Sequence, residues 1–388
     1  MTRADHYDVI VVGVGAMGSA TCAAVAARGA RVLGLEQYDI PHSHGSSHGE
    51  TRIIRLAYYE HPSYVQLLRR SYELWDELQA WFDEPLLIRT GSLDIGPEDG
   101  WVFKGSLQSC LDNSLEHEVL SAAETSRRYP GYQLDPDALS LFQPDGGFLR
   151  PERSIVAHVQ RAHAHGGVIH AREPMTHWTS DENGVTVTTT RGTYHAERLV
   201  LCTGAWIAEH SGSLTDLSVP ERQVLGWFQP HKPDLFTPDR FPVFNLENEH
   251  GRWYGFPSYG IPGFKIGRYR HRGETGAPES FDWEPAPGDE ELLLDEVQRT
   301  FPQAAGPVMS LRVCMFTNTP DGHFIIDRAP DHPRVLLASP CSGHGFKFAP
   351  VIGEALAELA LEDSTRHDLS LFGLGRFTRS SPLAGTNS

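Results

Sequence analysis

Clustered basic side chains are missing from this sequence. Its 388 residues include 33 Lys and Arg against 50 Asp and Glu, which gives a formal net charge of −17. Proteins that bind nucleic acids need a basic surface against the phosphates, so we expect no nucleic-acid partner. A Lys or Arg inside an apolar motif therefore becomes a candidate for a specific role.

Paired cysteines and metal-binding spacings are also absent. The five cysteines are scattered, with no CxxC motif and an odd total, so we expect a reducing compartment, the cytoplasm. Among the 20 histidines, His42, His44 and His48 stand in a Gly- and Ser-rich stretch without partner cysteines. We therefore expect no metal site.

Long apolar runs are the third absence. The sequence has no segment of about 20 consecutive apolar residues, as a membrane-spanning helix requires. Residues 9–30 form the longest weakly polar stretch, but Asp5 and Asp8 precede it and glycines interrupt it, unlike a signal peptide. We expect no membrane partner, and a chain of this length forms one large or two medium domains.

A dinucleotide-binding motif opens the chain. The apolar run DVIVV at 8–12 is typical of a buried parallel strand, and GVGAMG at 13–18 leads into an Ala-rich helix. In this turn Gly13 permits the tight bend, Gly15 lets the backbone approach a pyrophosphate, and Gly18 allows close packing of helix and strand. Ala16 and Met17 begin the helix, whose N-terminus favours an anion.

A second strand completes this unit. Residues 31–36 read RVLGLE and end on Glu36, 21 residues after Gly15. A carboxylate at this position can accept hydrogen bonds from a ribose diol. Strand, turn, helix, strand and acid together predict nucleotide binding, although they do not separate FAD from NAD.

Other segments continue the α/β pattern. Apolar residues spaced by three or four predict a helix over 62–82, and alternation predicts a hairpin over 176–190. The stretch LVLCTGAW at 199–206, with Thr203 and Gly204, is similar to the strand and turn by which FAD-dependent oxidoreductases return to the nucleotide. A strand at 334–339 and an amphipathic helix over 351–359 close the pattern.

Three sequence blocks resemble the family of monomeric sarcosine oxidase and N-methyltryptophan oxidase. They are SSHGETRIIRLAY at 46–58, VCMFTNTPDGHFIID at 313–327 and SGHGFKFAP at 342–350, and the likeness runs along nearly the whole chain. The resemblance implies an α/β protein with a Rossmann-like FAD-binding domain, a doubly wound sheet with a β-hairpin insertion. It also implies an α+β substrate domain with an antiparallel sheet.

Domain boundaries follow from this resemblance and from composition. Residues 219–282 are rich in Pro, aromatics and short β-like runs, unlike a doubly wound sheet. We assign 1–86, 150–215 and 322–388 to the FAD-binding domain. We assign 87–149 and 216–321 to the substrate domain.

The resemblance implies how FAD is held. Cys314 stands at the family's cysteine that forms a thioether with the dimethylbenzene ring of the flavin. Thr51 and Arg52 approach the flavin. The last helix begins near its pyrimidine ring, where a helix N-terminus stabilises the negative charge of reduced flavin; the residues there are Gly343, Gly345, Phe346 and Lys347.

The resemblance also implies substrate contacts. Arg55 and Lys347 bind the substrate carboxylate, because an Arg fork matches a carboxylate and Lys adds a point charge. Arg52 and Arg55 are three apart, so on a helical turn they occupy neighbouring positions. Lys265 matches a family lysine that promotes oxygen reduction, and His48 lies in the block near the flavin.

Substrate identity is left open by several positions. Tyr254 belongs to an aromatic-rich stretch that lines the pocket or forms domain core. Phe316 stands where sarcosine oxidase has a tyrosine. At the family's active-site histidine, either Tyr269 replaces it or a local insertion lets His271 supply it. These departures make sarcosine itself a doubtful substrate.

The expected reaction is flavin-dependent oxidation of the C–N bond of a small secondary amino acid, N-methyl or cyclic, by a monomer. The imine hydrolyses, and oxygen becomes hydrogen peroxide. One alternative is a flavin amine dehydrogenase that passes electrons to a protein or quinone. Another is a non-catalytic nucleotide-binding protein, which leaves Cys314 without a purpose.

Overall fold

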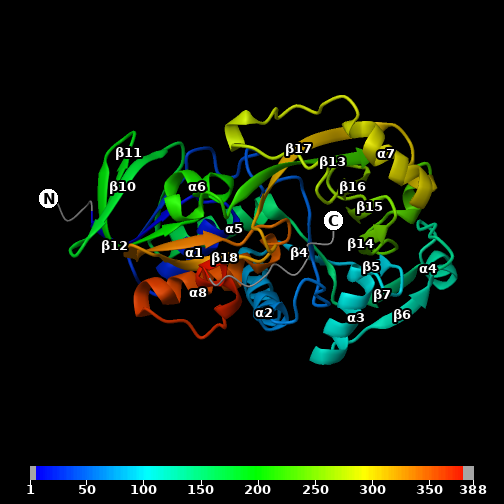
Figure 1. The fold of residues 1–388 in the computed structure, drawn as a ribbon, viewed down its shortest axis with the longest axis horizontal. Helices are drawn as coiled ribbons and strands as arrows, with labels where there is room; N and C mark the ends of the chain where they lie inside the picture. The colour runs from blue at the N-terminus through cyan, green and yellow to red at the C-terminus, as the bar shows by residue number, and fades with distance from the viewer. Residues whose placement is uncertain (1–5, 379–388) are drawn as a thin grey trace.

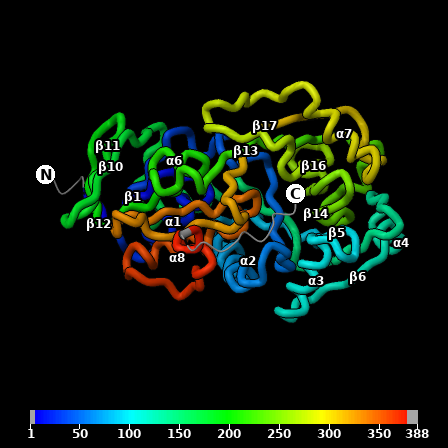
Figure 2. The backbone as a smooth tube through the Cα atoms, in the orientation of Figure 1, coloured from blue at the N-terminus to red at the C-terminus, as the bar shows by residue number. Residues whose placement is uncertain are grey.

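Three β-sheets organise the computed structural model, which describes residues 6–378. The two large sheets lie side by side, with the dinucleotide motif in the left one in Figure 1. Blue, green and orange to red segments form the left half of Figure 2, whereas cyan and yellow segments lie in the right half. Each half is therefore built from separate stretches of the chain.

The first sheet contains the predicted βαβ unit. β1 (His6–Val12) leads through α1 (Ala16–Ala27) to β2 (Val32–Leu35), and β1 and β2 are parallel. β1 also pairs in parallel with β12 (Thr193–Leu201), which in turn pairs with β19 (His332–Ser339). The remaining strands are β9 (Val168–His170), the hairpin of β10 (Met175–Asp181) and β11 (Gly184–Thr189), and β18 (Ile325–Ala329).

Alternating side chains of β1 bury both faces of this sheet. Val9 and Val11 join a core with α1 and α8, whereas Ile10 and Val12 join a second core with the hairpin. Such burial on both faces explains the continuous apolar run in the sequence. Helix α1 packs between α5 and α8; the long helices of this half are α2 (Tyr64–Phe82), α5 (Pro151–Ala164) and α8 (Ala349–Glu362).

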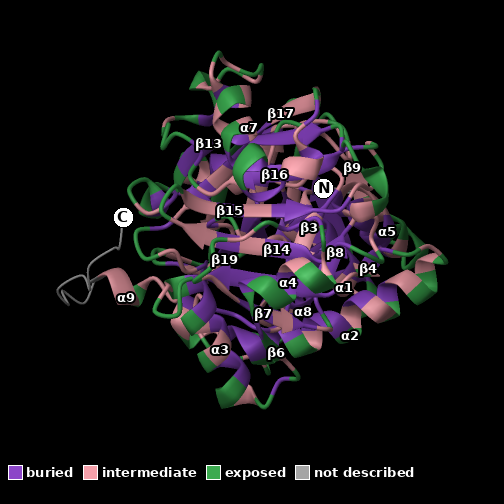
Figure 3. Cartoon of the chain, turned by 90° about the vertical axis from the view of Figure 1, so that its right-hand side faces the viewer, coloured by how far each residue is buried: buried purple, intermediate pink, exposed green. Residues whose placement is uncertain are grey.

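The second sheet has the strand order β17-β13-β16-β15-β14-β5-β7-β6. Its pairs are antiparallel except for β5 and β14, which are parallel, so the predicted antiparallel sheet is mixed at this point. β13 and β16 are largely buried, whereas β14 and β15 combine buried and intermediate residues (Figure 3). The strands are β5 (Ser92–Gly96), β6 (Glu118–Ser121), β7 (Leu139–Gln143), β13 (Val219–Phe228), β14 (Val243–Asn248), β15 (Gly251–Phe256), β16 (Phe264–Arg268) and β17 (Val308–Asn318).

A small third sheet joins the two halves. It consists of β3 (Arg52–Ile54), β8 (Gly147–Leu149) and β4 (Leu87–Arg89), with β8 in the middle. The shorter helices are α3 (Trp101–Asn113), α4 (Ala122–Arg128), α6 (Ile207–His210), α7 (Asp289–Thr300) and α9 (Gly375–Thr378).

The expected elements are present. The helix over 62–82, the hairpin over 176–190 and the closing strand and helix are confirmed as α2, β10 with β11, β19 and α8. Strands of the first sheet fall within the segments assigned to FAD binding, and strands of the second within those assigned to the substrate. The domain division itself stays a prediction, since residues 1–5 and 379–388 lie outside the described part and β3 pairs with β8 across the proposed boundary. Within the described residues, no helix is both long and apolar enough to cross a membrane.

Candidate active site

One cavity extends from the dinucleotide turn to the second sheet. Most of the predicted site residues line it. They are Gly13, Gly15, Ala16, Met17, Glu36, Arg52, Arg55, Thr203, Gly204, Tyr254, Tyr269, Cys314, Phe316, Gly343, Gly345, Phe346 and Lys347. Gly18, Thr51, His48, Lys265 and His271 do not line it.

The nucleotide end of the cavity is shaped by glycines. Gly13 has φ +87°, and a Cβ there would lie 2.5 Å from the carbonyl oxygen of Cys202. A Cβ on Gly18 would lie 1.7 Å from the Gly13 oxygen, so Gly18 permits the packing of α1 on β1. Above Gly15 a Cβ would meet nothing within 4 Å. The turn is thus closed beneath and open toward the cavity, as close approach of a phosphate requires.

Glu36 is fixed at the end of β2. Its Oε2 accepts from the backbone N–H of Val14 at 2.8 Å, and Oε1 accepts from the N–H of Tyr38 at 3.0 Å. The carboxylate is 4 % exposed and faces the cavity. Its position agrees with a ribose acceptor.

Cys314 and Arg52 meet at the middle of the cavity. The Arg52 guanidinium donates to the Thr51 and Ser46 oxygens, both at 2.8 Å, and Nη2 lies 3.5 Å from the Cys314 sulfur. Arg52 belongs to β3, so the expectation of a helical turn over 52–55 is wrong. β-branched Ile53 and Ile54 favour a strand, in which alternate side chains point to opposite faces.

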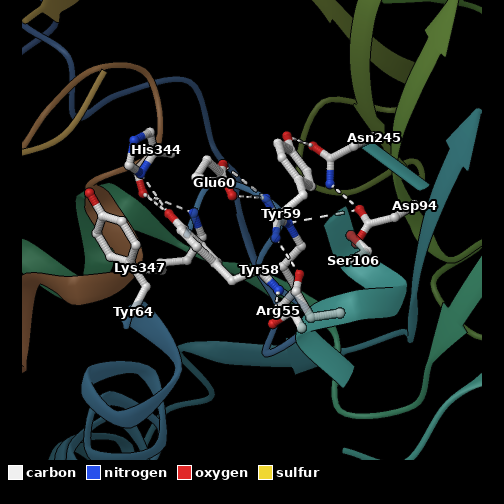
Figure 4. Close-up of polar contacts among 12 residues, drawn as sticks. Arg55, Tyr58, Tyr59, Glu60, Tyr64, Asp94, Ser106, Asn245, His344 and Lys347 are labelled. Atoms are coloured by element: carbon white, nitrogen blue, oxygen red, sulfur yellow. Dashed lines mark hydrogen bonds and ion pairs between the residues drawn. The ribbon is translucent and has the colours of Figure 1, made fainter. Parts of the chain in front are cut away.

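Arg55 is buried and already paired. Its Nη2 donates to both oxygens of Glu60, at 3.0 and 2.8 Å, and Nε lies 3.8 Å from Asp94 Oδ1. The guanidinium is also 4.0 Å from the ring centroid of Tyr59 and 4.5 Å from that of Tyr58. Figure 4 shows this cluster. A substrate carboxylate could therefore reach Arg55 only by displacing Glu60.

The charges of this cluster depend on one another. Burial alone would raise the pKa of Glu60, but Arg55, with His344 and Lys347, lowers it to about 2. Glu60 and Asp94 hold the pKa of Arg55 above its ordinary value despite burial. Sequence reasoning missed Glu60 and Asp94. Glu60 follows Arg55 by five residues and could have been suspected, whereas Asp94 comes from another sheet.

Lys347 lies beside this cluster, in the turn that precedes α8. Its Nζ donates to the carbonyl oxygen of His344 at 2.8 Å and lies 5.2 Å from the Tyr58 ring centroid. The Tyr58 hydroxyl is 2.6 Å from His344 Nδ1. Burial, with repulsion from Arg55, lowers the pKa of Lys347 to about 7. This amine therefore changes charge near neutral pH.

Lys265 and His48 lie behind the cavity wall. Lys265 Nζ donates to the carbonyl oxygens of Gly49 and Thr51, at 2.7 and 3.0 Å, and to the Thr51 hydroxyl at 2.8 Å. Burial and Arg52 lower the pKa of Lys265, although three acceptors match the three hydrogens of an ammonium group. His48 instead borders a neighbouring pocket, and burial with nearby cations lowers its pKa to about 3.

Of the two candidates for the family's histidine, the structure brings Tyr269 to the cavity and not His271. The Tyr269 hydroxyl donates to the backbone carbonyl oxygen of Ser342 at 2.9 Å. The ring centroids of Tyr269 and Phe316 are 5.3 Å apart. Arg270 between them has φ 57°, which turns the chain away. His271 Nε2 then lies 2.9 Å from Asp289 Oδ1 on α7, fully buried.

His271→Ala is expected to lower the free energy of unfolding by about 1–3 kcal/mol, because a buried hydrogen bond to Asp289 is lost. Urea denaturation measures this change. The KM for substrate should be unchanged, whereas Tyr269→Phe, which removes a hydroxyl at the cavity wall, should alter it. A raised KM for His271→Ala with unchanged stability would show that His271 reaches the substrate.

Among the described residues, one group offers metal-type ligands, Glu354, Glu358 and His367. Both carboxylates already bind arginines, since Arg70 lies 2.9 Å from Glu354 and Arg28 lies 3.2 Å from Glu358. The group therefore serves as an ion-pair network between α8 and its neighbours.

The chain is similar to known proteins along nearly its whole length. The model of the family described as FAD dependent oxidoreductase matches residues 8–359. The monomeric sarcosine oxidase of Streptomyces avermitilis is 43% identical over 94% of this chain and 96% of its own. The N-methyl-L-tryptophan oxidase of Salmonella agona is 35% identical over 96% and 100%.

A solved structure extends the likeness. The open form of NikD, an unusual amino acid oxidase essential for nikkomycin biosynthesis, has a TM-score of 0.85 and 26% identity and covers 95% of this chain and 97% of its own. Glycine oxidase from Geobacillus kaustophilus shares the fold, with a TM-score of 0.78. The chain belongs to the FAD dependent oxidoreductase family and, within it, to the group of monomeric sarcosine oxidases and N-methyltryptophan oxidases.

Proposed function

We propose that this enzyme oxidises the C–N bond of a small secondary amino acid and reduces oxygen to hydrogen peroxide. The observation that carries the proposal is one cavity that joins the glycine turn and Glu36 to the cations Arg55 and Lys347. Two electrons and two protons leave the substrate to give an imine, which water hydrolyses. The same electrons and two protons convert oxygen to peroxide.

The cavity wall fits FAD. The Thr203 and Ser46 hydroxyls line the cavity, are buried, and have no hydrogen-bond partner within the described chain, so both remain available to a ligand. Gly13, Gly15 and Glu36 would hold the pyrophosphate and ribose. FAD supplies the two-electron acceptor when bound.

The chain's own residues would bind and orient the substrate. Arg55 offers a planar fork for the carboxylate, and Lys347 adds a second cation. Glu60 must give up its pair with Arg55 when the carboxylate arrives. Lys347, which also lowers the pKa of Glu60, then remains as the cation near it. Rings of Tyr254, Phe316 and Tyr269 line the same cavity and exclude water.

Peroxide release by the purified protein tests the proposal. The substrates are sarcosine, N-methyl aromatic amino acids, proline, pipecolate and glycated amino acids, assayed in air. Peroxide with any of them supports an oxidase. Anaerobic bleaching of the flavin without peroxide in air would favour the alternative, a dehydrogenase with a protein or quinone acceptor. The family membership excludes the third interpretation, a non-catalytic nucleotide-binding protein.

Lys265→Met is expected to slow reoxidation of the reduced enzyme by oxygen on the order of 10²-fold, because a fixed cation stabilises developing negative charge. Stopped-flow absorbance measures the rate. Anaerobic reduction by substrate should change little. Equal slowing of both steps would contradict the assignment of Lys265 to the oxygen reaction.

The ratio of the wild-type kcat/KM to the kcat/KM of Lys347→Met is expected to fall about tenfold as pH rises through about 7. Below this pH Lys347 carries a charge that attracts the carboxylate, and above it the charge is lost. The ratio cancels ionisation of the substrate amine, which both enzymes share. The measurement covers about pH 6 to about pH 8.5, roughly one unit or more on either side of the pKa of Lys347. A ratio that does not change over this range would refute a role for this charge.

Three finer features belong to the same proposal. Cys314 forms a covalent link to FAD, supported by its sulfur at the cavity wall beside Arg52. The enzyme acts as a monomer, as the names of its relatives suggest. It acts in the cytoplasm, which agrees with five free cysteines.

A further inference from the structure

Arg252 on β15 is half-buried among three aromatic rings, two of which line the cavity. Its guanidinium carbon lies 4.1 Å from the ring centroid of Tyr269, 4.3 Å from that of Trp101 and 5.6 Å from that of Tyr59. Tyr59 and Tyr269 line the cavity, whereas Trp101 is 42% exposed. Arg252 therefore lies between the substrate cavity and the outer surface.

Among residues 6–378, the side chain of Arg252 forms no ion pair with a carboxylate, and its hydrogen bond goes to Tyr59. The residue opposite it on β14 is Glu247. Glu247 Oε2 instead accepts from the backbone N–H of Val102 at 2.8 Å, in the first turn of α3, where the helix N-terminus favours a negative charge. Glu247, which could have neutralised Arg252, thus stabilises the N-terminus of α3 instead.

The way Arg252 is held leaves its N–H groups available. Stacking with aromatic rings uses the faces of a guanidinium, whereas carboxylates bind along its edge. Within the described chain, one hydrogen bond uses that edge, from Nη2 to the Tyr59 hydroxyl at a long 3.4 Å. A fork of five N–H donors is thereby oriented by the rings and largely free to bind an anion.

Arg252 and Arg55 share one ring. The guanidinium carbon of Arg55 lies 4.0 Å from the Tyr59 ring centroid, and that of Arg252 lies 5.6 Å from it. The distance between the two carbons is therefore no greater than the sum of these two distances. The Tyr59 hydroxyl also contacts Asn245, which donates to Asp94 at 2.7 Å. Both cations therefore contact one ring of this network, and their separation is bounded by the two distances.

We infer that Arg252 binds a second carboxylate on the substrate side chain, so the preferred substrates are N-alkyl derivatives of acidic amino acids. This inference rests on the proposed function, with the α-carboxylate on Arg55. Aspartate and glutamate derivatives separate their carboxylates by two and three carbons, which suits two cations around one ring. Neutral side chains of the same size would leave the edge of Arg252 without an anion.

The test compares kcat/KM for N-methyl-L-glutamate with N-methyl-L-glutamine, and for N-methyl-L-aspartate with N-methyl-L-asparagine. The wild type should prefer the acids. Arg252→Met should lower kcat/KM for the acids on the order of 10²-fold and change it little for the amides. Arg268→Met is the matched control, because Arg268 lies over Trp253 and donates to backbone oxygens outside the cavity.

The outcomes separate this inference from the proposed function. Peroxide formation without a preference for acids, or equal losses for acids and amides in Arg252→Met, overturns the role of Arg252 and leaves the oxidase intact. Absence of both peroxide and anaerobic flavin reduction with every N-alkyl amino acid overturns both. If Arg252→Met does not fold, Arg252→Lys replaces it in the test, because Lys keeps the charge and loses the fork. The preference of the wild type for the acids is then the second measurement.

Discussion

Arg55→Met is expected to lower kcat/KM for an N-alkyl amino acid substrate on the order of 10³-fold. Arg55 is 2% exposed, and its Nη2 now donates to both oxygens of Glu60. Removal of one partner of a desolvated, hydrogen-bonded charge pair costs about 2–5 kcal/mol. Steady-state kinetics measured by peroxide release gives the value.

The single variant leaves Glu60 and Asp94 buried without their cation, which destabilises the fold. Arg55→Met combined with Glu60→Gln removes most of that strain, and it should keep the kinetic loss. Glu60→Gln alone should lower KM, because the neutral amide competes less with the substrate for Arg55. A raised KM in Glu60→Gln would show that Glu60 helps to bind the substrate.

Arg70→Met is the matched control for Arg55→Met. Arg70 also forms a bidentate pair, with Glu354 at 3.1 and 2.9 Å, but it lies outside the cavity wall. Its loss should change stability and leave kcat/KM within about twofold. If Arg55→Met behaved like Arg70→Met, Arg55 would have a structural role and the carboxylate site would lie elsewhere.

The parts of the site that the sequence predicted are those encoded within one segment. Gly13, Gly15 and Glu36 stand at fixed spacings in a βαβ unit, so local rules locate them. Cys314 and Lys347 were found through blocks shared with a family. In both cases the information lies in neighbouring residues, and the fold then brings the blocks together at one cavity.

The parts that were missed depend on contacts between distant segments. Asp94 on β5 and Asn245 on β14 are direct partners in a parallel pair, yet about 150 residues separate them. No local pattern marks such a pair. The choice between Tyr269 and His271 was similarly set by a turn at Arg270 and by Asp289 on α7, which periodicity cannot reveal.

Tyr254 illustrates a third case. The aromatic-rich stretch that contains it was expected to line the pocket or to form domain core, and both are true of that stretch. Trp253 is buried in the core of the second sheet, while Tyr254 lines the cavity. Alternation along β15 sends successive side chains to opposite faces, so neighbouring residues have different roles.

FAD is expected to stay on the denatured wild-type polypeptide. In Cys314→Ala it is expected to be fully released. Acid precipitation followed by absorbance of the supernatant at the flavin band measures the release. The Cys314 sulfur lies 3.5 Å from the Arg52 guanidinium, which helps to position it at the cavity wall. Arg52→Met should therefore also reduce the covalently bound fraction.

Two other cysteines line the cavity and provide the control. Burial raises the pKa of Cys202 to about 12 and that of Cys341 to about 11, which leaves both thiols protonated and unreactive near neutral pH. Cys341→Ala should therefore retain its flavin through acid treatment. Release of flavin from the wild type would show that the link is not covalent, and retention in Cys314→Ala would assign it to another residue.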